Sequence, residues 1–351
     1  MFIDYKKKTF ESNKVVLSFS LLVEKKMNST AELSNHSFRS KCHPEGYPGE
    51  HLIGNIFAFL YIAIVILGFP SNCFSVFVSY QHIRQGNAMG VYLMNLALAD
   101  LFFIMMLPIW VDNILAEEWR HGGFACNLCV FLLFTHFYAS VSMLCCIAVD
   151  RYMAVVHPLR FPYIRKLGTV VGVCVLSWTC TMAFNCITVS HYVYDDTDKI
   201  CLYAFPMPLQ AKVNIARFFA WFLVPSLLVG FCCWKTSKEV RSNRATEEEE
   251  CKRVCRLLWL VQLTLSICFG PFHIMLLLMN QVEDCETLTW MFYLYKVTVI
   301  LASLNCLADP LLYCFITRSG RASVTKAFLL LQRKDPGNSM EGELKQPFHK
   351  P

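Results

Sequence analysis

Seven long apolar stretches dominate this sequence, and each is long enough to cross a lipid bilayer as a helix. A transmembrane helix needs roughly 20 consecutive, mainly apolar residues. Hydrophobic residues make up 55% of the 351-residue chain and charged residues only 17%, whereas a soluble domain has about 25% charged residues. The stretches lie near 52–80, 89–115, 125–149, 168–190, 211–234, 254–280 and 288–316. The sequence therefore predicts an all-α membrane protein with one seven-transmembrane helix bundle over 52–316.

The charges between the stretches predict the orientation of the bundle, because Lys and Arg accumulate in cytoplasmic loops. Basic residues follow the third and fifth stretches: Arg151, Arg160, Arg165, Lys166, Lys235, Lys238 and Arg241. Acidic residues gather on the opposite side, as in 195–198 and 283–286. We therefore expect an extracellular N-terminus over 1–51 and a cytoplasmic tail over 331–351. The net charge of +6 reflects this topology, so nucleic acid is not an expected partner.

The N-terminal segment carries two sequons for N-glycosylation, which begin at Asn28 and Asn35. Their predicted location outside the cell agrees with the charge bias. Residues 15–23 form a short apolar run between lysines, loosely like the core of a signal peptide, without a clear cleavage site. The alternative that we favour is that Met27 is a second start codon and that 1–26 are a dispensable extension.

Each apolar stretch contains a polar residue or proline that is unusual in a membrane helix. In chain order these are Asn72, Asp100, Arg151, Trp178, Pro225, Pro271 and Pro310. Singly, each has a structural explanation, since membrane helices tolerate proline kinks and a buried amide can bond across helices. Together with Asp150-Arg151-Tyr152 and Asp309-Pro310-Leu311-Leu312-Tyr313, they resemble the rhodopsin-like (class A) G-protein-coupled receptors over about 53–328.

Several strings resemble one subgroup of that family, the proton-sensing receptors. They include Leu107-Pro108-Ile109-Trp110-Val111-Asp112, Trp119-Arg120-His121-Gly122 and Cys268-Phe269-Gly270-Pro271-Phe272-His273. Neighbouring receptors for lysolipids and nucleotides share some of these strings. The resemblance implies a plasma-membrane receptor that activates heterotrimeric G proteins. A channel or transporter would need a lined pore or discontinuous helices, and the sequence shows neither pattern. An enzyme would need a metal-binding motif or a nucleophile motif within a span, and neither motif stands out.

The resemblance also implies disulfides on the outer side of the membrane, where the environment is oxidising. It pairs Cys126 with Cys201, as in the wider family, and Cys42 with Cys285, as in the subgroup. Most of the 18 cysteines lie in the apolar stretches instead, where a free cysteine behaves as a small hydrophobic residue.

On the inner side, the resemblance implies a switch for G-protein coupling. Asp150 would hold Arg151 in the resting state, and Tyr152 and Tyr313 would belong to the same two-state element. Cys233 departs from the family, since many relatives have a tyrosine at that position. Residues 317–330 are typical of a short amphipathic eighth helix that lies against membrane lipids.

Four polar residues within the stretches match the sodium pocket of the family. These residues are Asp100, Ser140, Asn305 and Asp309. Two carboxylates that lie close together bind a cation or share a proton. The resemblance therefore implies a sodium ion in the bundle core, with Asp100 and Asp309 also candidates for proton sensing. The alternative is a hydrogen-bonded polar core, and we expect no other cofactor.

Two histidines on the outer side are candidates for sensing protons. Histidine is the side chain whose ordinary pKa lies near physiological pH. His121 and His191 match positions that are histidine in the proton-sensing relatives, and acidic residues stand near both in the sequence. The alternative is that both are solvated loop residues. His136 and His273 lie within the stretches, where packing or a ligand cavity explains them.

An anionic lipid, such as a lysophospholipid or fatty acid, is the rival ligand. Arg217 and Lys296 form a cationic pair that would face the ligand cavity together with His273 and Phe269, and cations inside a membrane bundle are usually functional. Thr181 supports this alternative, since proton-sensing relatives often carry a buried glutamate there.

Overall fold

The computed structural model describes residues 50–157, 160, 162–189, 201, 208–242, 248–279, 281–282 and 285–316. This part of the chain contains seven helical spans that are long and apolar enough to cross a membrane. The helices are α2 (Glu50–Arg84), α3 (Met89–Ala116), α4 (Gly122–Val156), η1 (Pro162–Arg165), α5 (Leu167–Val189), α6 (Pro208–Phe218), η2 (Phe219–Leu223), α7 (Val224–Ser242), α8 (Glu248–Thr264), η3 (Leu265–Phe269), α9 (Gly270–Met279), α10 (Cys285–Ser303) and α11 (Asn305–Ile316). The predicted all-helical seven-span class is confirmed.

Several predictions lie outside the described residues. They concern the N-terminal segment with Asn28 and Asn35, Cys42, the outer loop with His191, the eighth helix over 317–330 and the tail. For Tyr313 and Cys285, the structure describes the backbone within α11 and α10 but not the side chain.

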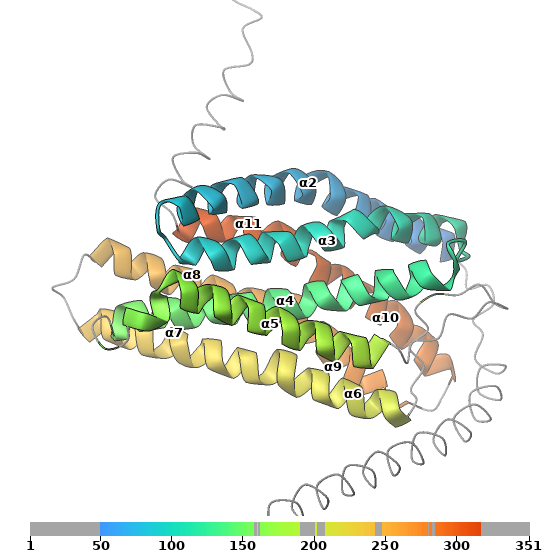
Figure 1. Cartoon of the computed structure of the whole chain (residues 1–351). Coiled ribbons are helices and arrows are strands. Elements are labelled where there is room, and N and C mark those ends of the chain that lie inside the picture. Colours follow the sequence, from blue (N-terminus) through green and yellow to red (C-terminus); the bar gives the residue numbers. More distant parts are fainter. Residues whose placement is uncertain are drawn as a thin grey trace, which may run out of the picture.

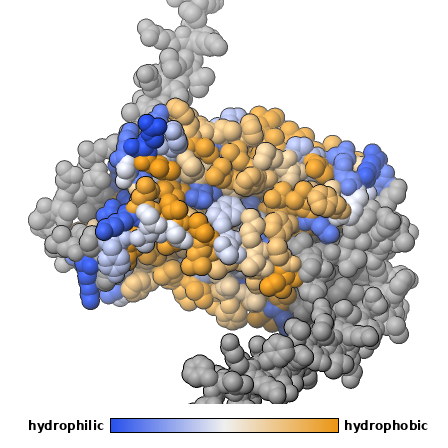
Figure 2. Space-filling model, viewed as in Figure 1, coloured by the Kyte–Doolittle hydropathy of each residue, from blue (hydrophilic) through white to orange (hydrophobic). Residues whose placement is uncertain are grey.

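The helices pack side by side along one common axis, with α2, α3 and α11 on one flank and α6 and α7 on the other (Figure 1). The central helix is α4, since 72% of its most apolar window is buried, against 22% for α2 and α5. On the face that Figure 2 shows, apolar side chains cover most of the middle, while hydrophilic residues gather toward the two ends. This distribution is that of a bundle whose outer surface contacts lipid.

Two prolines interrupt the regular hydrogen bonding of the fifth and sixth spans. A proline lacks the N–H that an α-helix bonds to the carbonyl four residues earlier. Each proline follows a π-helical segment that contains this carbonyl: η2 before Pro225 and η3 before Pro271. Such π-segments are frequent at functional sites, and η3 ends at Phe269.

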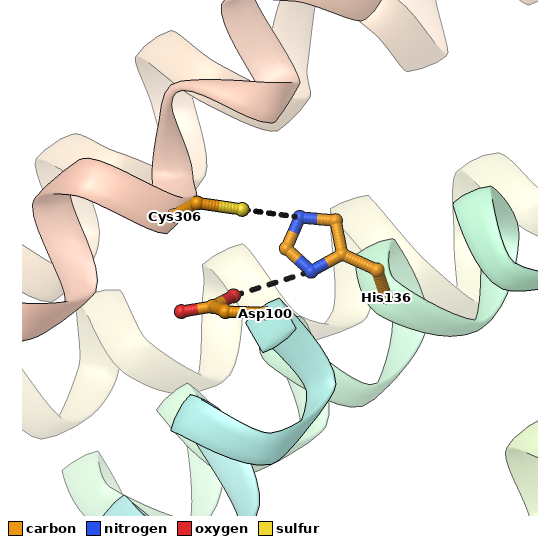
Figure 3. A group of neighbouring side chains, drawn as sticks. All are labelled: Asp100, His136 and Cys306. Atoms are coloured by element: carbon orange, nitrogen blue, oxygen red, sulfur yellow. Dashed lines mark hydrogen bonds and ion pairs between the residues drawn. The ribbon is translucent and has the colours of Figure 1, made fainter. Parts of the chain in front are cut away.

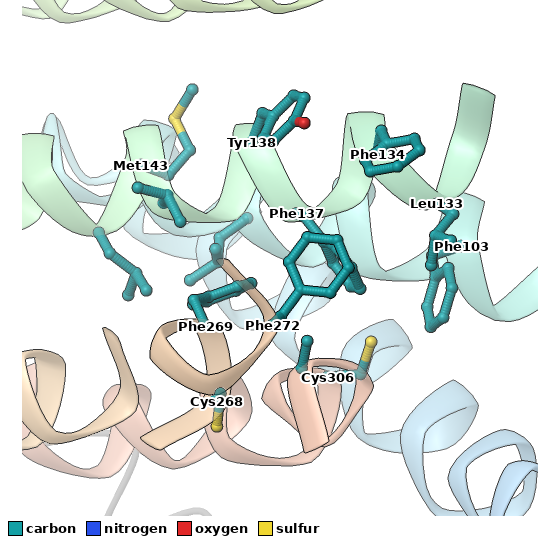
Figure 4. Packing of buried hydrophobic residues seen from close by; sticks show 14 of the residues in the cluster. Phe103, Leu133, Phe134, Phe137, Tyr138, Met143, Cys268, Phe269, Phe272 and Cys306 are labelled. Atoms are coloured by element: carbon teal, nitrogen blue, oxygen red, sulfur yellow. The ribbon is translucent and has the colours of Figure 1, made fainter. Parts of the chain in front are cut away.

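Aromatic side chains fill the centre of the bundle (Figure 4). Phe137 of α4 meets Phe269 and Phe272 edge to face, with ring centres 5.8 and 5.1 Å away. Edge-to-face pairs of this kind add about 0.5–1.5 kcal/mol to the energy of burial. The aromatic cluster therefore couples α4 to the sixth span at the π-segment.

Hydrogen bonds of polar side chains connect the helices where apolar packing alone would not specify their positions. Asn72 donates to the carbonyl of Cys306 at 2.9 Å, which joins α2 to α11. Trp178 donates to the side chain of Asn95 at 2.8 Å, which joins α5 to α3. The residues that the motifs singled out at Asn72 and Trp178 thus serve packing between helices.

Candidate functional site

One histidine–carboxylate pair connects the C-terminal end of α3 to the start of α4. Nε2 of His121, the residue before α4, is 2.9 Å from a carboxylate oxygen of Asp112 in the last turns of α3. Trp119 holds this corner in place, because it is almost fully buried and its Nε1 donates to the carbonyl of Gly122 at 2.8 Å. Its ring meets the imidazole of His121 edge on, with centres 5.4 Å apart.

A second pair of this kind connects α2 to the end of α3, and the sequence did not indicate it. Nδ1 of His51 lies 2.5 Å from a carboxylate oxygen of Glu117. Glu117 ends α3 in the left-handed conformation, with φ 58°, which glycine or asparagine usually adopts there. Its location at the start of the first span was the only sequence signal for His51, and its partner Glu117 is far away in the chain.

The disulfide between Cys126 and Cys201 attaches Cys201, which lies between α5 and α6 in the chain, to the N-terminal part of α4, with Cα atoms 5.6 Å apart. Both cysteines are buried. The pair Cys42–Cys285 stays a prediction, because Cys42 and the side chain of Cys285 lie outside the described residues.

The polar core contains the four residues that match the sodium pocket, and all four are buried. Asn305 donates to the carboxylate of Asp309 at 2.6 Å. His136 of α4, which sequence reasoning assigned to packing or the ligand cavity, lies against Asp100, with Nδ1 3.2 Å from Oδ1 (Figure 3). Whether Asp100 and Asp309 respond to protons stays a prediction.

The two predicted ligand-binding cations pack on different aromatic rings. Arg217 of α6 is fully buried, and its guanidinium carbon lies 4.2 Å from the ring centre of Phe134 in α4. Lys296 is half-buried, and its Nζ lies 4.9 Å from the ring centre of Phe292 on its own helix α10. Cation–π contacts of this kind stabilise a charge that is removed from water. An anionic headgroup would have to share these cations with the rings.

His273 and Phe269, the other candidates for the ligand cavity, are both buried. The imidazole of His273 lies between the rings of Phe222 and Phe272. Neither of its ring nitrogens has a hydrogen-bond partner among the described residues. Buried polar atoms without a partner are rare in proteins, so His273 is available to a ligand or water.

Near the C-terminal end of α4, Arg151 folds back on its neighbour Asp150. Its Nη2 and Nε donate to one carboxylate oxygen at 2.6 and 3.1 Å. Arg165 of η1 lies 3.6 Å from the other oxygen, a contact that the sequence did not indicate. Tyr152 meets His157 instead, with its hydroxyl 3.2 Å from Nε2. Cys233 is buried.

A seven-span helix bundle with an Asp-Arg pair near the C-terminal end of its third span and a polar core defines a class of membrane signalling receptors. The family model described as "7 transmembrane receptor (rhodopsin family)" matches residues 71–313. The chain therefore belongs to the rhodopsin family of seven-transmembrane receptors, whose members are receptors rather than enzymes.

Relatives in the curated collection agree with this assignment. "G-protein coupled receptor 68" of Mus musculus is 36% identical over 78% of this chain and 76% of its own length. "G-protein coupled receptor 65" of Homo sapiens is 33% identical over 80% of this chain and 88% of its own. "Lysophosphatidic acid receptor 6" of Mus musculus is 24% identical over 80% and 86%. The predicted class, with its resemblance to the proton-sensing subgroup, is confirmed.

Proposed function

We propose that this chain is a plasma-membrane receptor, with its N-terminus outside, that activates heterotrimeric G proteins when the extracellular pH falls. The observation that carries this proposal is the presence of two histidine–carboxylate pairs on the outer ends of the first three spans. His51 pairs with Glu117 and His121 with Asp112. Each pair joins two different helices or helix ends, so a change in its strength acts on their relative position.

Protonation changes both pairs in the same direction. A neutral imidazole and a carboxylate form a hydrogen bond, whereas an imidazolium and a carboxylate form an ion pair with a charge-assisted hydrogen bond. Acid therefore strengthens both contacts, and this contribution is lost as the pH rises. A proton that binds one conformation better shifts the equilibrium by about 1.4 kcal/mol for each tenfold difference in affinity.

The continuous helix α4 supports transmission of this change to the inner side. It runs from Gly122, next to His121, to Val156, beyond the Asp150–Arg151 pair. Release of Arg151 from Asp150 would free its guanidinium for a G protein, as in other two-state switches of this kind.

The test is second-messenger output, measured as cyclic AMP and calcium in cells that express the full chain, across about pH 6 to 8. Four variants are compared with the wild type: His51→Phe, His121→Phe, His191→Phe and the triple variant. The matched control is His82→Phe, at the opposite end of α2. We expect the triple variant to lose most of the acid response and the control to keep it.

A wild-type response that is flat across this range would end the proton proposal. So would a response that the triple variant retains at the wild-type midpoint, provided that antibody labelling shows equal amounts of both proteins at the cell surface.

A receptor for an anionic lysophospholipid or fatty acid is the second candidate. The complete burial of Arg217 favours it, because buried charges in a membrane bundle are usually functional. A relative named for lysophosphatidic acid adds weaker support. Arg217→Gln and Lys296→Gln would then abolish a lipid-induced signal and leave the acid response intact. If both variants kept the lipid signal, this candidate would be wrong.

A further inference from the structure

We propose that the imidazole of His136 takes the place in the bundle core where the family pattern puts a sodium ion, and that this receptor binds no sodium there. The proposal goes beyond the proton proposal and rests only on the family assignment and on the contacts of His136. His136 would then be the residue that fills the core with a ring of the chain itself in place of a free cation.

The first argument is the position of the ring. Nδ1 of His136 lies 3.2 Å from Oδ1 of Asp100 and 3.4 Å from Oγ of Ser140, two of the four predicted sodium ligands. Nε2, on the other side of the ring, lies 3.6 Å from Sγ of Cys306 (Figure 3). An ion bound to Asp100 and Ser140 together would have to lie between their oxygens, where the ring nitrogen already is.

The second argument is that the ring is held in this position. The imidazole of His136 is completely buried. It stacks on Phe103 with ring centres 4.6 Å apart and planes 11° apart, and Phe137 covers it at 5.4 Å. Interiors packed in this way resist movement of a side chain into a new rotamer. The ring therefore cannot swing aside to admit an ion without disturbing the aromatic cluster around α4.

The third argument concerns the other two predicted ligands. Asn305 directs its Nδ2 to the carboxylate of Asp309 at 2.6 Å. Asp309 therefore has a donor from within the chain, while the imidazole of His136, rather than an ion, lies against Asp100 and Ser140.

The donor chemistry points the same way. A hard cation prefers an all-oxygen set of ligands, whereas imidazole nitrogen and thiolate sulfur suit softer metals such as zinc. The ligand atoms of Asp100, His136 and Cys306 lie within 4.8 Å of one another. One neutral tautomer meets both ring contacts, because Nδ1–H can face Asp100 while Nε2 faces the Cys306 thiol. No change of protonation is needed.

The consequence is a core that does not respond to the sodium concentration. An ion that prefers one conformation shifts an equilibrium according to its concentration and its affinity. A group tethered to the chain has no such concentration dependence. His136 would hold α3, α4 and α11 together at Asp100 and Cys306 regardless of the salt outside.

The test compares sodium chloride with choline chloride at equal ionic strength and fixed pH. The first readout is the thermal melting temperature of the purified full-length receptor, and the second is G-protein nucleotide exchange in membranes. We expect the wild type to give the same values in both salts. His136→Asn removes the ring. We expect nucleotide exchange in this variant to be about threefold slower in sodium chloride than in choline chloride. This is the factor for an ion that is present at twice its Kd.

His136→Phe is the matched control, because it keeps a ring against Phe103 but removes the nitrogens; it should stay insensitive to sodium. Sodium dependence in the wild type that disappears in Asp100→Asn would overturn the proposal. Insensitivity of a folded His136→Asn would also overturn it. Zinc that co-purifies with the wild type but not with Cys306→Ser would also overturn the proposal. Asp100, His136 and Cys306 would then form a metal site. If His136→Asn did not fold, the melting temperatures of the wild type in the two salts would still test the proposal. The melting temperature does not depend on signalling. A failure of the His136 proposal can therefore be told apart from a failure of the proton proposal.

Discussion

The carboxylate of Asp112, near the C-terminal end of α3, lies 2.9 Å from Nε2 of His121, which precedes α4. Half of the Asp112 side chain and about one third of the His121 side chain are exposed, so water and salt screen this pair. Exposed ion pairs contribute about 0.2–1 kcal/mol. The pair is therefore strong enough to tune a response to pH and too weak to determine the fold.

The first prediction concerns this pair directly. In Asp112→Asn the protonated imidazole loses its anionic partner, so more acid is needed for the same response. We expect the midpoint of the cyclic AMP response to move toward lower pH. The control is Glu118→Gln, whose carboxylate contacts Arg120 at 2.8 Å. An equal shift in the control would mean that any outer carboxylate has this effect.

The second prediction concerns the contact between His51 and Glu117. If the two side chains act as one unit, removing either partner removes the whole contribution. His51→Gln, Glu117→Gln and the double variant should therefore shift the response midpoint by similar amounts. Shifts that simply add in the double variant would show that the two residues act independently.

The third prediction concerns the buried corner at Trp119. Trp119→Ala removes a large buried ring, which costs about 3–5 kcal/mol in protein cores. Trp119→Phe keeps most of the packing and loses the hydrogen bond to Gly122, at a cost of about 1 kcal/mol. The melting temperature of the purified receptor should therefore be highest for the wild type, lower for Trp119→Phe and lowest for Trp119→Ala. Equal melting temperatures for all three proteins would contradict the role of Trp119 in holding this corner.

The fourth prediction concerns the inner end of α4. Asp150→Asn removes the anion that holds Arg151 at 2.6 Å, so the basal rate of G-protein nucleotide exchange should rise. Arg165→Ala removes a longer contact of 3.6 Å to the same carboxylate, and we expect a smaller change. Measurement in membranes without added ligand gives both values. A basal rate that falls in Asp150→Asn would mean that Asp150 contributes to coupling rather than restraint.

Much of the fold follows from local properties of the sequence. The length and apolar content of each stretch require a spanning helix, because the bilayer leaves no other way to satisfy the backbone. Pro225 and Pro271 sit where the prolines of the family pattern predicted, and each follows a π-segment because it removes one hydrogen bond. These are effects of neighbouring residues, and a sequence shows neighbours directly.

The contacts that give the site its chemistry depend on residues far apart in the chain. His136 contacts Cys306 across 170 positions, and His51 reaches Glu117 from another helix. A sequence pattern assigned His136 to packing or the ligand cavity and left His51 without a role. Hydropathy and motifs report what each helix is made of. Which side chains face one another depends on the rotation and axial position of each helix, and packing of the whole bundle sets both.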